Sequence, residues 1–304
     1  MALREYLLTE VALDHAEGHL TRREALRKLG LMGLTVAGAS ALLTACGADE
    51  PTGSPALSAP AAPTSPPTAG VAAAGYDVAA ARARTTAVTF PGAAGELRGV
   101  LAPAGSPRGA VLVIHENRGL TDHIAAVAGR LAGDGYTALG IDLVSRAGGT
   151  SAVPDATAAL AGLSEPDLLA DLAAGLDELR RRAPGQALGA LGFCFGGGMV
   201  WKLLAAGAPG LAAAVPFYGP VPDPVSFERS DAAVLGVFAE LDARVNAGRD
   251  RAEAALTAAD LAHELRVVPG VDHAFFNDTG PRFNLAAAQT TYPAVLDWFG
   301  QHLG

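Results

Sequence analysis

A cysteine set between glycines is the feature of this chain that most directly suggests chemistry. Residues 192–198 read GFCFGGG and follow an apolar run, so Cys194 lies at a turn between a predicted strand and a predicted helix. The pattern has the form of a nucleophile elbow, with Cys in the place of the usual Ser. Such a turn lifts its central side chain above the sheet, and glycines two positions away leave room for neighbouring backbone. The alternative is a small buried thiol packed under a helix, which is common for free cysteine.

Two residues further along the chain could activate this thiol. A thiol nucleophile needs a base, and the base needs an acid that orients it. In chains with such an elbow the order is nucleophile, acid, histidine. Asp242 directly follows an apolar strand-like run, and His273 lies in a loop after the last predicted strand. Asp272 is adjacent to His273, but neighbouring side chains in an extended loop point apart, so we favour Asp242. An ordinary loop residue is the alternative for each.

A third stretch, VLVIHENRGLTDHI at residues 111–124, places polar residues after a strand. His115, Glu116 and Asn117 follow its apolar part. The loop after this strand normally supplies one N–H group of an oxyanion hole. The residue after the nucleophile, Phe195, opens a helix, and its N–H is placed to supply another. From the residues alone, Glu116 could equally be a surface carboxylate.

Strands and helices alternate through the part of the chain that carries these residues. This alternation predicts an α/β domain with a mostly parallel sheet. Functional groups gather at the carboxyl ends of such strands, where the three stretches above lie. The predicted strands are Thr85–Phe90, Leu97–Leu101, Ala110–His115, Tyr136–Leu143, Ala187–Phe193, Ala212–Tyr218, Ala233–Ala239 and His263–Val268. The predicted helices are Asp122–Asp134, Glu165–Arg182, Phe195–Ala206, Asn246–Ala259 and Leu285–Leu303.

Four motifs in order, IHENRGL, GFCFGGG, LDARV and DHAFFND, resemble those of the dienelactone hydrolase family, the carboxymethylenebutenolidases. The resemblance covers roughly residues 85–303. It implies an α/β-hydrolase fold, a mostly parallel sheet of about eight strands with helices on both faces. It also implies a triad of Cys194, His273 and Asp242. Glu116 would contact the resting thiol and control its ionisation, and the N–H groups of Asn117 and Phe195 would bind the oxyanion.

The same resemblance bears on the substrate. Two arginines hold the substrate carboxylate in known members of the family. Arg146 stands where one is expected, although a solvated loop arginine is the alternative. The other is expected four residues after the histidine, where this chain has Asn277. Arg118 or Arg282 could substitute, but their positions are not equivalent. This departure leaves the expected hydrolase chemistry unaffected, but it puts dienelactone itself in doubt as the substrate.

Composition narrows the range of partners. The net charge of −9, with no basic cluster, argues against nucleic acid and against electrostatic docking to anionic lipid. The sequence contains neither a cluster of residues at metal-ligand spacing nor a phosphate-binding loop. We therefore expect no metal and no cofactor, a small ester or lactone as substrate, and a monomer.

The N-terminal region has the form of an export signal. Arg22 and Arg23 fit a twin-arginine signal, and a short apolar run follows them. The run ends in LLTAC, which resembles the lipobox of bacterial lipoproteins and marks Cys46 for acylation. The expected organisation is a signal at 1–45, a Pro- and Ala-rich disordered linker from the lipidated Cys46 to residue 75, and a hydrolase domain at 76–304. This predicts a protein anchored by lipid in the cell envelope, on the outer side of the cytoplasmic membrane or in the periplasm. A single N-terminal membrane anchor is the alternative.

The function expected from these residues is hydrolysis of a lactone or carboxylic ester through a thioester. A general esterase or peptidase-like enzyme of the same fold is one alternative. A lipid-anchored binding protein that has lost catalysis is another, although such a protein has no reason to keep all three triad groups. A redox sensor at Cys194 would lack a resolving partner once Cys46 is acylated. The stretch Ser145–Glu165 is the candidate for a lid.

Overall fold

The structure is a computed structural model that describes residues 3–47 and 76–304. The chain divides into two compact units, Met1–Leu7 with Val78–Gly304, and Leu8–Asp77. The first unit contains every predicted site residue except Cys46. Most of the predicted linker, residues 48–75, lies outside the described residues.

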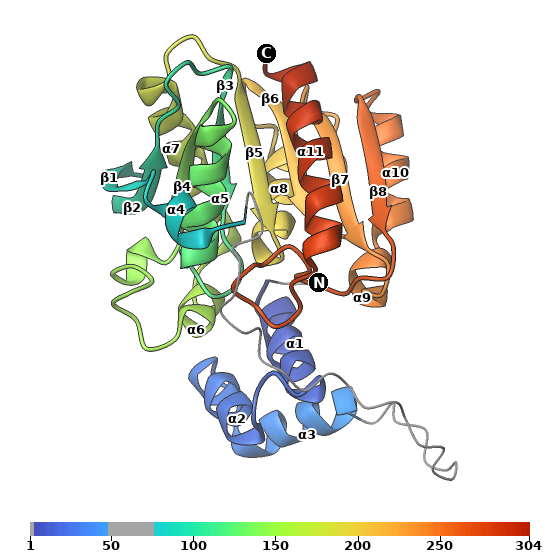
Figure 1. The fold of residues 1–304 in the computed structure, drawn as a ribbon. Helices are drawn as coiled ribbons and strands as arrows, with labels where there is room; N and C mark the ends of the chain where they lie inside the picture. The colour runs from blue at the N-terminus through green and yellow to red at the C-terminus, as the bar shows by residue number, and fades with distance from the viewer. Residues whose placement is uncertain (1–2, 48–75) are drawn as a thin grey trace. The chain divides into compact units, whose positions relative to one another are not determined.

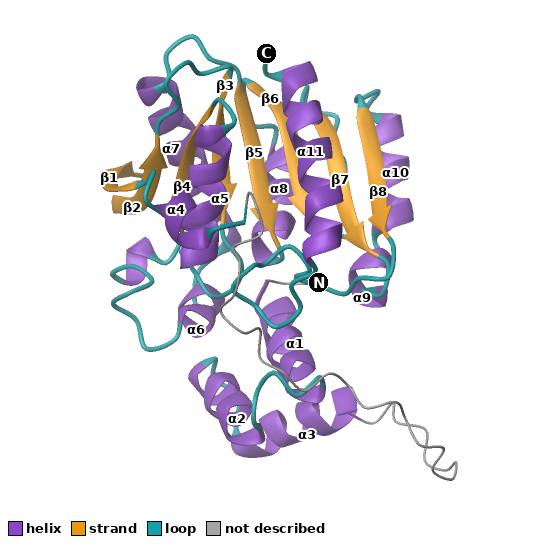
Figure 2. Cartoon of the chain, viewed as in Figure 1, coloured by secondary structure: helices purple, strands orange, loops and turns teal. Residues whose placement is uncertain are grey.

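Eight strands form one sheet in the order β1-β2-β4-β3-β5-β6-β7-β8, as Figure 2 shows in orange. β1 and β2 form an antiparallel edge, and the six strands from β3 to β8 run parallel. All eight predicted strands are confirmed: β7 and β8 have the predicted ends, and the ends of the others differ by at most two residues. They are β1 (Thr86–Gly92), β2 (Gly95–Ala102), β3 (Gly109–Ile114), β4 (Tyr136–Asp142), β5 (Leu188–Phe193), β6 (Leu211–Phe217), β7 (Ala233–Ala239) and β8 (His263–Val268).

Helices cover both faces of this sheet. In Figure 1, α5 and α11 lie on one face and α7 and α8 on the other, which confirms the predicted α/β-hydrolase architecture. The helices that follow the first strands are α5 (Asp122–Gly133), α6 (Ala156–Ala161), α7 (Glu165–Arg182), α8 (Phe195–Ala206), α9 (Ala243–Asn246), α10 (Arg249–Ala258) and α11 (Leu285–His302). A short helix α4 (Val78–Arg82) precedes β1, and a 3₁₀ turn η1 (Ser145–Ala147) follows β4.

One predicted helix has the wrong start. The helix expected at Asn246–Ala259 begins three residues later, as α10 at Arg249, and a separate short helix, α9, ends at Asn246. The Asp242 side chain caps α9 at the Val245 N–H, so this short helix starts three residues before the predicted one. This cap also holds Asp242 at the carboxyl end of β7.

Burial explains why the parallel strands end at a single functional edge. Every residue of β3, β5 and β7 is buried, as expected for parallel strands covered by helices on both faces. A strand in this setting cannot slip or tilt without exposing apolar side chains to water. The loops at its carboxyl end are therefore held in fixed positions relative to one another.

The N-terminal region forms three helices. α1 (Leu3–Ala16) begins in the larger unit, while α2 (Arg22–Leu31) and α3 (Val36–Gly47) belong to the smaller one. Thr21 and Glu24 form a capping box at the start of α2. Cys46 lies in the last turn of α3. Among the helices that the structure describes, none is both long and apolar enough to cross a membrane.

Candidate active site

Cys194 occupies the tight turn between β5 and α8. Its φ of 55° lies in the left-handed region, which non-glycine residues rarely adopt, so the backbone is strained there. The Cys194 N–H donates to the Phe217 carbonyl at 3.0 Å, which joins the turn to the end of β6. α8 begins at the next residue, Phe195. This is the strand–turn–helix geometry that the motif predicts.

The glycines on either side of the turn provide the expected clearance. A Cβ on Gly192 would lie 2.3 Å from the Gly196 carbonyl oxygen, and one on Gly196 would lie 2.3 Å from the Ile114 carbonyl oxygen. Both distances are too short for any real Cβ contact. The turn can therefore form only with glycine at these two positions.

Asp242 and His273 meet as the sequence predicts. The Nδ1 atom of His273 lies 2.6 Å from Oδ2 of Asp242, and both residues are buried. Asp272 instead accepts the backbone N–H of His273, at 2.6 Å. Burial opposes ionisation of Asp242, but the hydrogen bond and charge of His273, with smaller contributions from the Val245 N–H and Arg244, lower its pKa. Asp242 is therefore an ionised partner for the imidazole.

Cys194 and His273 lie close enough to exchange a proton after a small movement. A ring nitrogen of His273 lies within 4.8 Å of the Cys194 sulfur. Nδ1 faces Asp242, so Nε2 lies on the side of the ring away from that carboxylate. Catalytic hydrogen bonds are often long in structures without substrate. The arrangement suits transfer of the thiol proton to the imidazole.

Glu116 lies at the same edge, directly after β3. It is 5 % exposed, and its Oε2 atom accepts a hydrogen bond from the Asn277 side-chain amide. Its other oxygen, Oε1, is buried and has no hydrogen-bond partner among the described residues. Asn277, which follows His273 by four residues, thus contacts Glu116.

Asn117 lies in the loop after β3, and Phe195 is the first residue of α8. Both are buried, and the Asn117 carbonyl accepts a hydrogen bond from the Thr157 hydroxyl at 3.1 Å. Thr157 belongs to α6, so this bond joins the loop after β3 to the segment predicted as a lid. Arg146 and Thr150 also fasten that segment, to α7 and to Asp142 respectively. Motion of the segment stays a prediction.

Tyr218 is a site residue that lies outside the four sequence motifs. It follows the last residue of β6 and is completely buried, and its ring centroid lies 5.1 Å from that of His273. One signal could have found it: β6 neighbours the strand of the nucleophile, and Tyr218 stands at its carboxyl end.

Comparison with known proteins shows which family the chain belongs to. The model of the "Dienelactone hydrolase family" matches residues 97–303. The chain belongs to this family. An Escherichia coli protein named "Putative carboxymethylenebutenolidase" is 32 % identical over 214 residues, which cover 65 % of this chain and 79 % of that protein. Such relatives identify this member of the dienelactone hydrolase family as an ester-bond hydrolase.

Solved structures show the same fold for this dienelactone hydrolase family member. A "Putative Dienelactone Hydrolase" from Klebsiella pneumoniae is 28 % identical, with a TM-score of 0.63, covering 72 % of this chain and 99 % of that one. A dienelactone hydrolase-like promiscuous phosphotriesterase from metagenomic libraries is 24 % identical, with a TM-score of 0.62, covering 73 % of this chain and 100 % of that one. The second likeness supports the fold alone.

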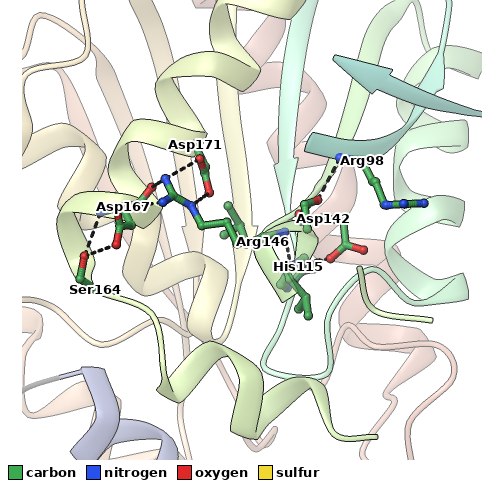
Figure 3. A network of polar contacts seen from close by, with 10 residues as sticks. Arg98, His115, Asp142, Arg146, Ser164, Asp167 and Asp171 are labelled. Carbon is green, nitrogen blue, oxygen red and sulfur yellow. Dashed lines mark hydrogen bonds and ion pairs between the residues drawn. The ribbon is translucent and has the colours of Figure 1, made fainter. Parts of the chain in front are cut away.

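The first arginine expected to bind substrate in this dienelactone hydrolase family member is engaged elsewhere. Figure 3 shows Arg146 directed toward α7, where its guanidinium bonds both Asp167 and Asp171. The Nε and Nη2 atoms meet the Asp171 carboxylate at 2.7 and 2.9 Å, and Nη1 meets Asp167 at 2.9 Å. These bonds tie η1 to α7, and a substrate carboxylate would have to displace the two aspartates in order to bind Arg146.

The other two arginine candidates lie in loops, Arg118 after β3 and Arg282 before α11. Arg118 is exposed, and Arg282 is half-buried. Their substrate-binding roles stay predictions.

A pocket of about 250 Å³ lies beside the start of α8 in this family member. Phe195, Met199 and Val245 contribute apolar walls, and Arg244 contributes positive charge. Tyr6, from the same compact unit, also lines it. The Tyr6 hydroxyl lies 3.2 Å from the Cys194 sulfur, and the Arg244 guanidinium lies 5.0 Å from the centre of its ring. In the intact chain Tyr6 thus covers a thiol that is 3 % exposed.

Proposed function

We propose that the protein hydrolyses carboxylic esters or lactones with Cys194 as its nucleophile. The observation that carries the proposal is the cysteine on a strained elbow, with a ring nitrogen of His273 within 4.8 Å and Asp242 behind that ring at 2.6 Å. An adjacent base and an orienting acid are what a thiol needs in order to act as a nucleophile.

The reaction follows from these positions. His273 takes the proton of Cys194, and the thiolate adds to the carbonyl carbon of the substrate. The N–H groups of Asn117 and Phe195 stabilise the resulting oxyanion, as donors of this kind do in acyl transfer. The intermediate collapses to a thioester, and the leaving alkoxide receives the proton from His273.

Water completes the cycle. His273 takes a proton from water, and the hydroxide adds to the thioester carbonyl. The second intermediate expels the Cys194 thiolate, which takes the proton back from His273, and the carboxylic acid is released. Asp242 orients the imidazole and stabilises its charged form in both halves of the reaction. The site then holds Cys194 and His273 as at the start.

The two cysteines of the chain provide a matched test. We expect Cys194→Ala to abolish hydrolysis of a small activated ester such as p-nitrophenyl acetate, and Cys46→Ala to leave it unchanged. Mass spectrometry after rapid quenching should detect an acyl group on Cys194 in the parent. Hydrolysis by Cys194→Ala at the parental rate would refute the proposal.

The substrate class is open to a direct screen. The Asn277 side chain is neutral, and the Arg146 donors are bonded to two aspartates. We therefore expect neutral esters and lactones to be hydrolysed at least as well as matched substrates that carry a carboxylate. Preference for the carboxylated set would contradict this expectation and would make Arg244 the residue to substitute next.

We further propose that the chain is exported and acylated at Cys46. The Arg22–Arg23 pair and the LLTAC sequence support this proposal. Metabolic labelling with a fatty-acid probe should mark the protein, and Cys46→Ser should remove the label. Replacement of both arginines by lysine should retain the protein in the cytoplasm. A labelled Cys46→Ser variant would argue against the anchor.

A further inference from the structure

Tyr218 leaves the sheet directly beside the nucleophile. β5 and β6 pair in parallel, with Phe193 opposite Phe217, so the next residues of the two strands are Cys194 and Tyr218. The Tyr218 N–H donates to the Val237 carbonyl at 2.7 Å, just as the Cys194 N–H donates to the neighbouring strand. The hydrogen bonds of the sheet thus hold both residues at the same edge.

The backbone at Tyr218 is strained. Its φ is 35°, in the left-handed region that favours glycine. The tyrosine takes this conformation even though the next residue, at position 219, is a glycine. A bulky aromatic residue adopts this conformation only at a cost in free energy, which the surrounding structure must offset. Packing of the ring against Phe217 and Phe275, with His273 nearby, holds it there. Strain of this kind clusters at functional sites.

The Tyr218 hydroxyl is a buried hydrogen-bond donor without an acceptor among the described residues. Its oxygen is buried and, among the described residues, makes no hydrogen bond of good geometry. Burial of a hydroxyl without a partner is unfavourable. Glu116 Oε1 is a buried acceptor in the same condition. The site therefore contains one buried donor and one buried acceptor that make no hydrogen bond among the described residues.

The charges around the hydroxyl are mainly negative. Burial, then the charges of Glu116, Cys194 and Asp278, and last the approach of the hydroxyl to the Glu116 carboxylate raise the pKa of Tyr218. The phenol therefore keeps its proton over the pH range in which a thiolate forms. His273, the ring next to Tyr218, is the cation that forms when Cys194 loses its proton. Asp278 is already paired with two groups of α5, which leaves Glu116 and Cys194 as the acceptors.

We propose that the Tyr218 hydroxyl donates a hydrogen bond to the anionic pair formed by Glu116 and the Cys194 thiolate. The inference rests on the proposed function, in which Cys194 is the nucleophile. Loss of the thiol proton places a second negative charge beside a buried carboxylate, and like charges at close range oppose ionisation. A neutral donor between them offsets this repulsion without itself carrying charge. Tyr218 thus promotes thiolate formation and is not a base.

Tyr218→Phe removes the hydroxyl and keeps the ring. Tyr136→Phe is the matched control, because Tyr136 is also completely buried, its hydroxyl also has no partner among the described residues, and it stands at the other end of the sheet, at the start of β4. All variants carry Cys46→Ser so that only one thiol reacts. Each is also made with Tyr6→Phe, since the Tyr6 hydroxyl contacts Cys194 as well.

The first readout is the rate of iodoacetamide alkylation of Cys194 against pH. We expect Tyr218→Phe to move the midpoint upward by about one pH unit, a tenfold change in the ionisation constant, and Tyr136→Phe to leave it in place. The second readout is ester hydrolysis, where kcat should fall about tenfold or more with little change in KM. An unchanged midpoint in Tyr218→Phe, or an equal shift in Tyr136→Phe, overturns the inference.

A further variant covers the case in which Tyr218→Phe folds poorly. Glu116→Gln removes the charge that the hydroxyl is proposed to share. In that background, Tyr218→Phe should shift the midpoint less than it does in the parent, and an equal shift would count against the proposal. Where Tyr218→Phe does not fold, Glu116→Gln should by itself lower the midpoint, and no change overturns the inference. Alkylation needs no turnover, so the two failures are distinguishable. A parental thiol that reacts no faster than an ordinary cysteine refutes the proposed function, whereas a reactive thiol indifferent to Tyr218 refutes only this inference.

Discussion

Two buried polar clusters lie at the carboxyl edge of the same sheet, and their hydrogen bonds differ. The Asp142 cluster follows β3 and β4 and consists of His115, Asp142, Ser145 and Thr150, with the backbone N–H of Arg98 donating to Ser145. Figure 3 labels His115 and Asp142 of this cluster. The Cys194 cluster follows β3, β5, β6, β7 and β8 and consists of Glu116, Cys194, Tyr218, Asp242 and His273. Both clusters contain a histidine and an aspartate that are almost fully buried.

The Asp142 cluster uses its polar atoms internally. Asp142 accepts from the Val144 N–H and from both the N–H and the hydroxyl of Thr150, at 2.7–3.0 Å. His115 bonds the Glu116 carbonyl through Nδ1 and the Leu143 N–H through Nε2. In the Cys194 cluster, by contrast, Glu116 Oε1 and the Tyr218 hydroxyl are buried without a partner among the described residues. Buried polar groups whose hydrogen bonds are all made stabilise a fold, whereas buried polar groups without partners can bind substrate or take part in a reaction.

The two histidines should respond oppositely to the same substitution. We expect His273→Gln to lower kcat/KM about a thousandfold or more, because it removes the proposed base, with little loss of stability. His115→Gln should leave kcat/KM of the folded protein close to that of the parent and lower its melting temperature. Ester hydrolysis and thermal unfolding, measured on both variants, test the comparison. A similar loss of activity in the two would contradict it.

Asp142→Asn should cost the most stability. Its new amide would direct N–H groups toward atoms that are themselves donors, in a site with a side chain 6 % exposed. We expect a loss of about 2–4 kcal/mol in the free energy of unfolding, measured by urea denaturation. Activity per folded molecule should stay near the parental value, and a loss below 1 kcal/mol would show that the cluster is not structural.

The two carboxylates that hold Arg146 should differ in importance. Asp171 has a side chain 1 % exposed, and that of Asp167 is 47 % exposed. Breaking a buried pair costs more than breaking an exposed one. We expect Asp171→Asn to lower the free energy of unfolding by about 2–3 kcal/mol and Asp167→Asn by less than about 1 kcal/mol. Equal losses would mean that Arg146 is held mainly by other contacts.

The Tyr6 side chain should limit the access of reagents to Cys194. Tyr6→Ala removes a ring that lies against Arg244 and a hydroxyl at 3.2 Å from the sulfur. We expect iodoacetamide to alkylate Cys194 about tenfold faster in this variant at a fixed pH, because an open thiol reacts faster than a covered one. Exposed-face Arg4→Ala is the control. An unchanged rate in Tyr6→Ala would show that Tyr6 does not limit access.

Acidification should lower the free energy of unfolding through His115 of the Asp142 cluster, by less than the substitution Asp142→Asn does. Burial lowers the pKa of His115 more than the nearby Asp142 raises it, so this histidine is neutral in the folded protein. An unfolded histidine binds a proton below about pH 6.5, so unfolding takes up a proton there and stability falls as the pH drops through that value. The slope from this residue is at most about 1.4 kcal/mol per pH unit. His115→Gln should have a shallower dependence of unfolding free energy on pH between 6.5 and 5, and an unchanged slope would exclude His115 as its source.

Local sequence patterns were sufficient for the strands and for the tight turn at Cys194. The strand pattern depends on burial along each segment, and the glycine spacing around Cys194 depends on backbone clearance within a few residues. Both are short-range requirements, so they are readable in the chain. The split between α9 and α10 was not predicted, because it depends on a cap by Asp242 that the periodic pattern does not reveal.

The roles of individual polar residues were decided by tertiary structure. Sequence order alone placed Asp242 and His273 after Cys194, and their meeting at 2.6 Å agrees with it. No local pattern could show that Arg146 is bonded to α7, that Asn277 contacts Glu116, or that Tyr218 lies buried beside His273. A local pattern constrains what a residue's own segment can form. Whether its polar atoms are saturated depends on segments distant in sequence that only the folded sheet brings together.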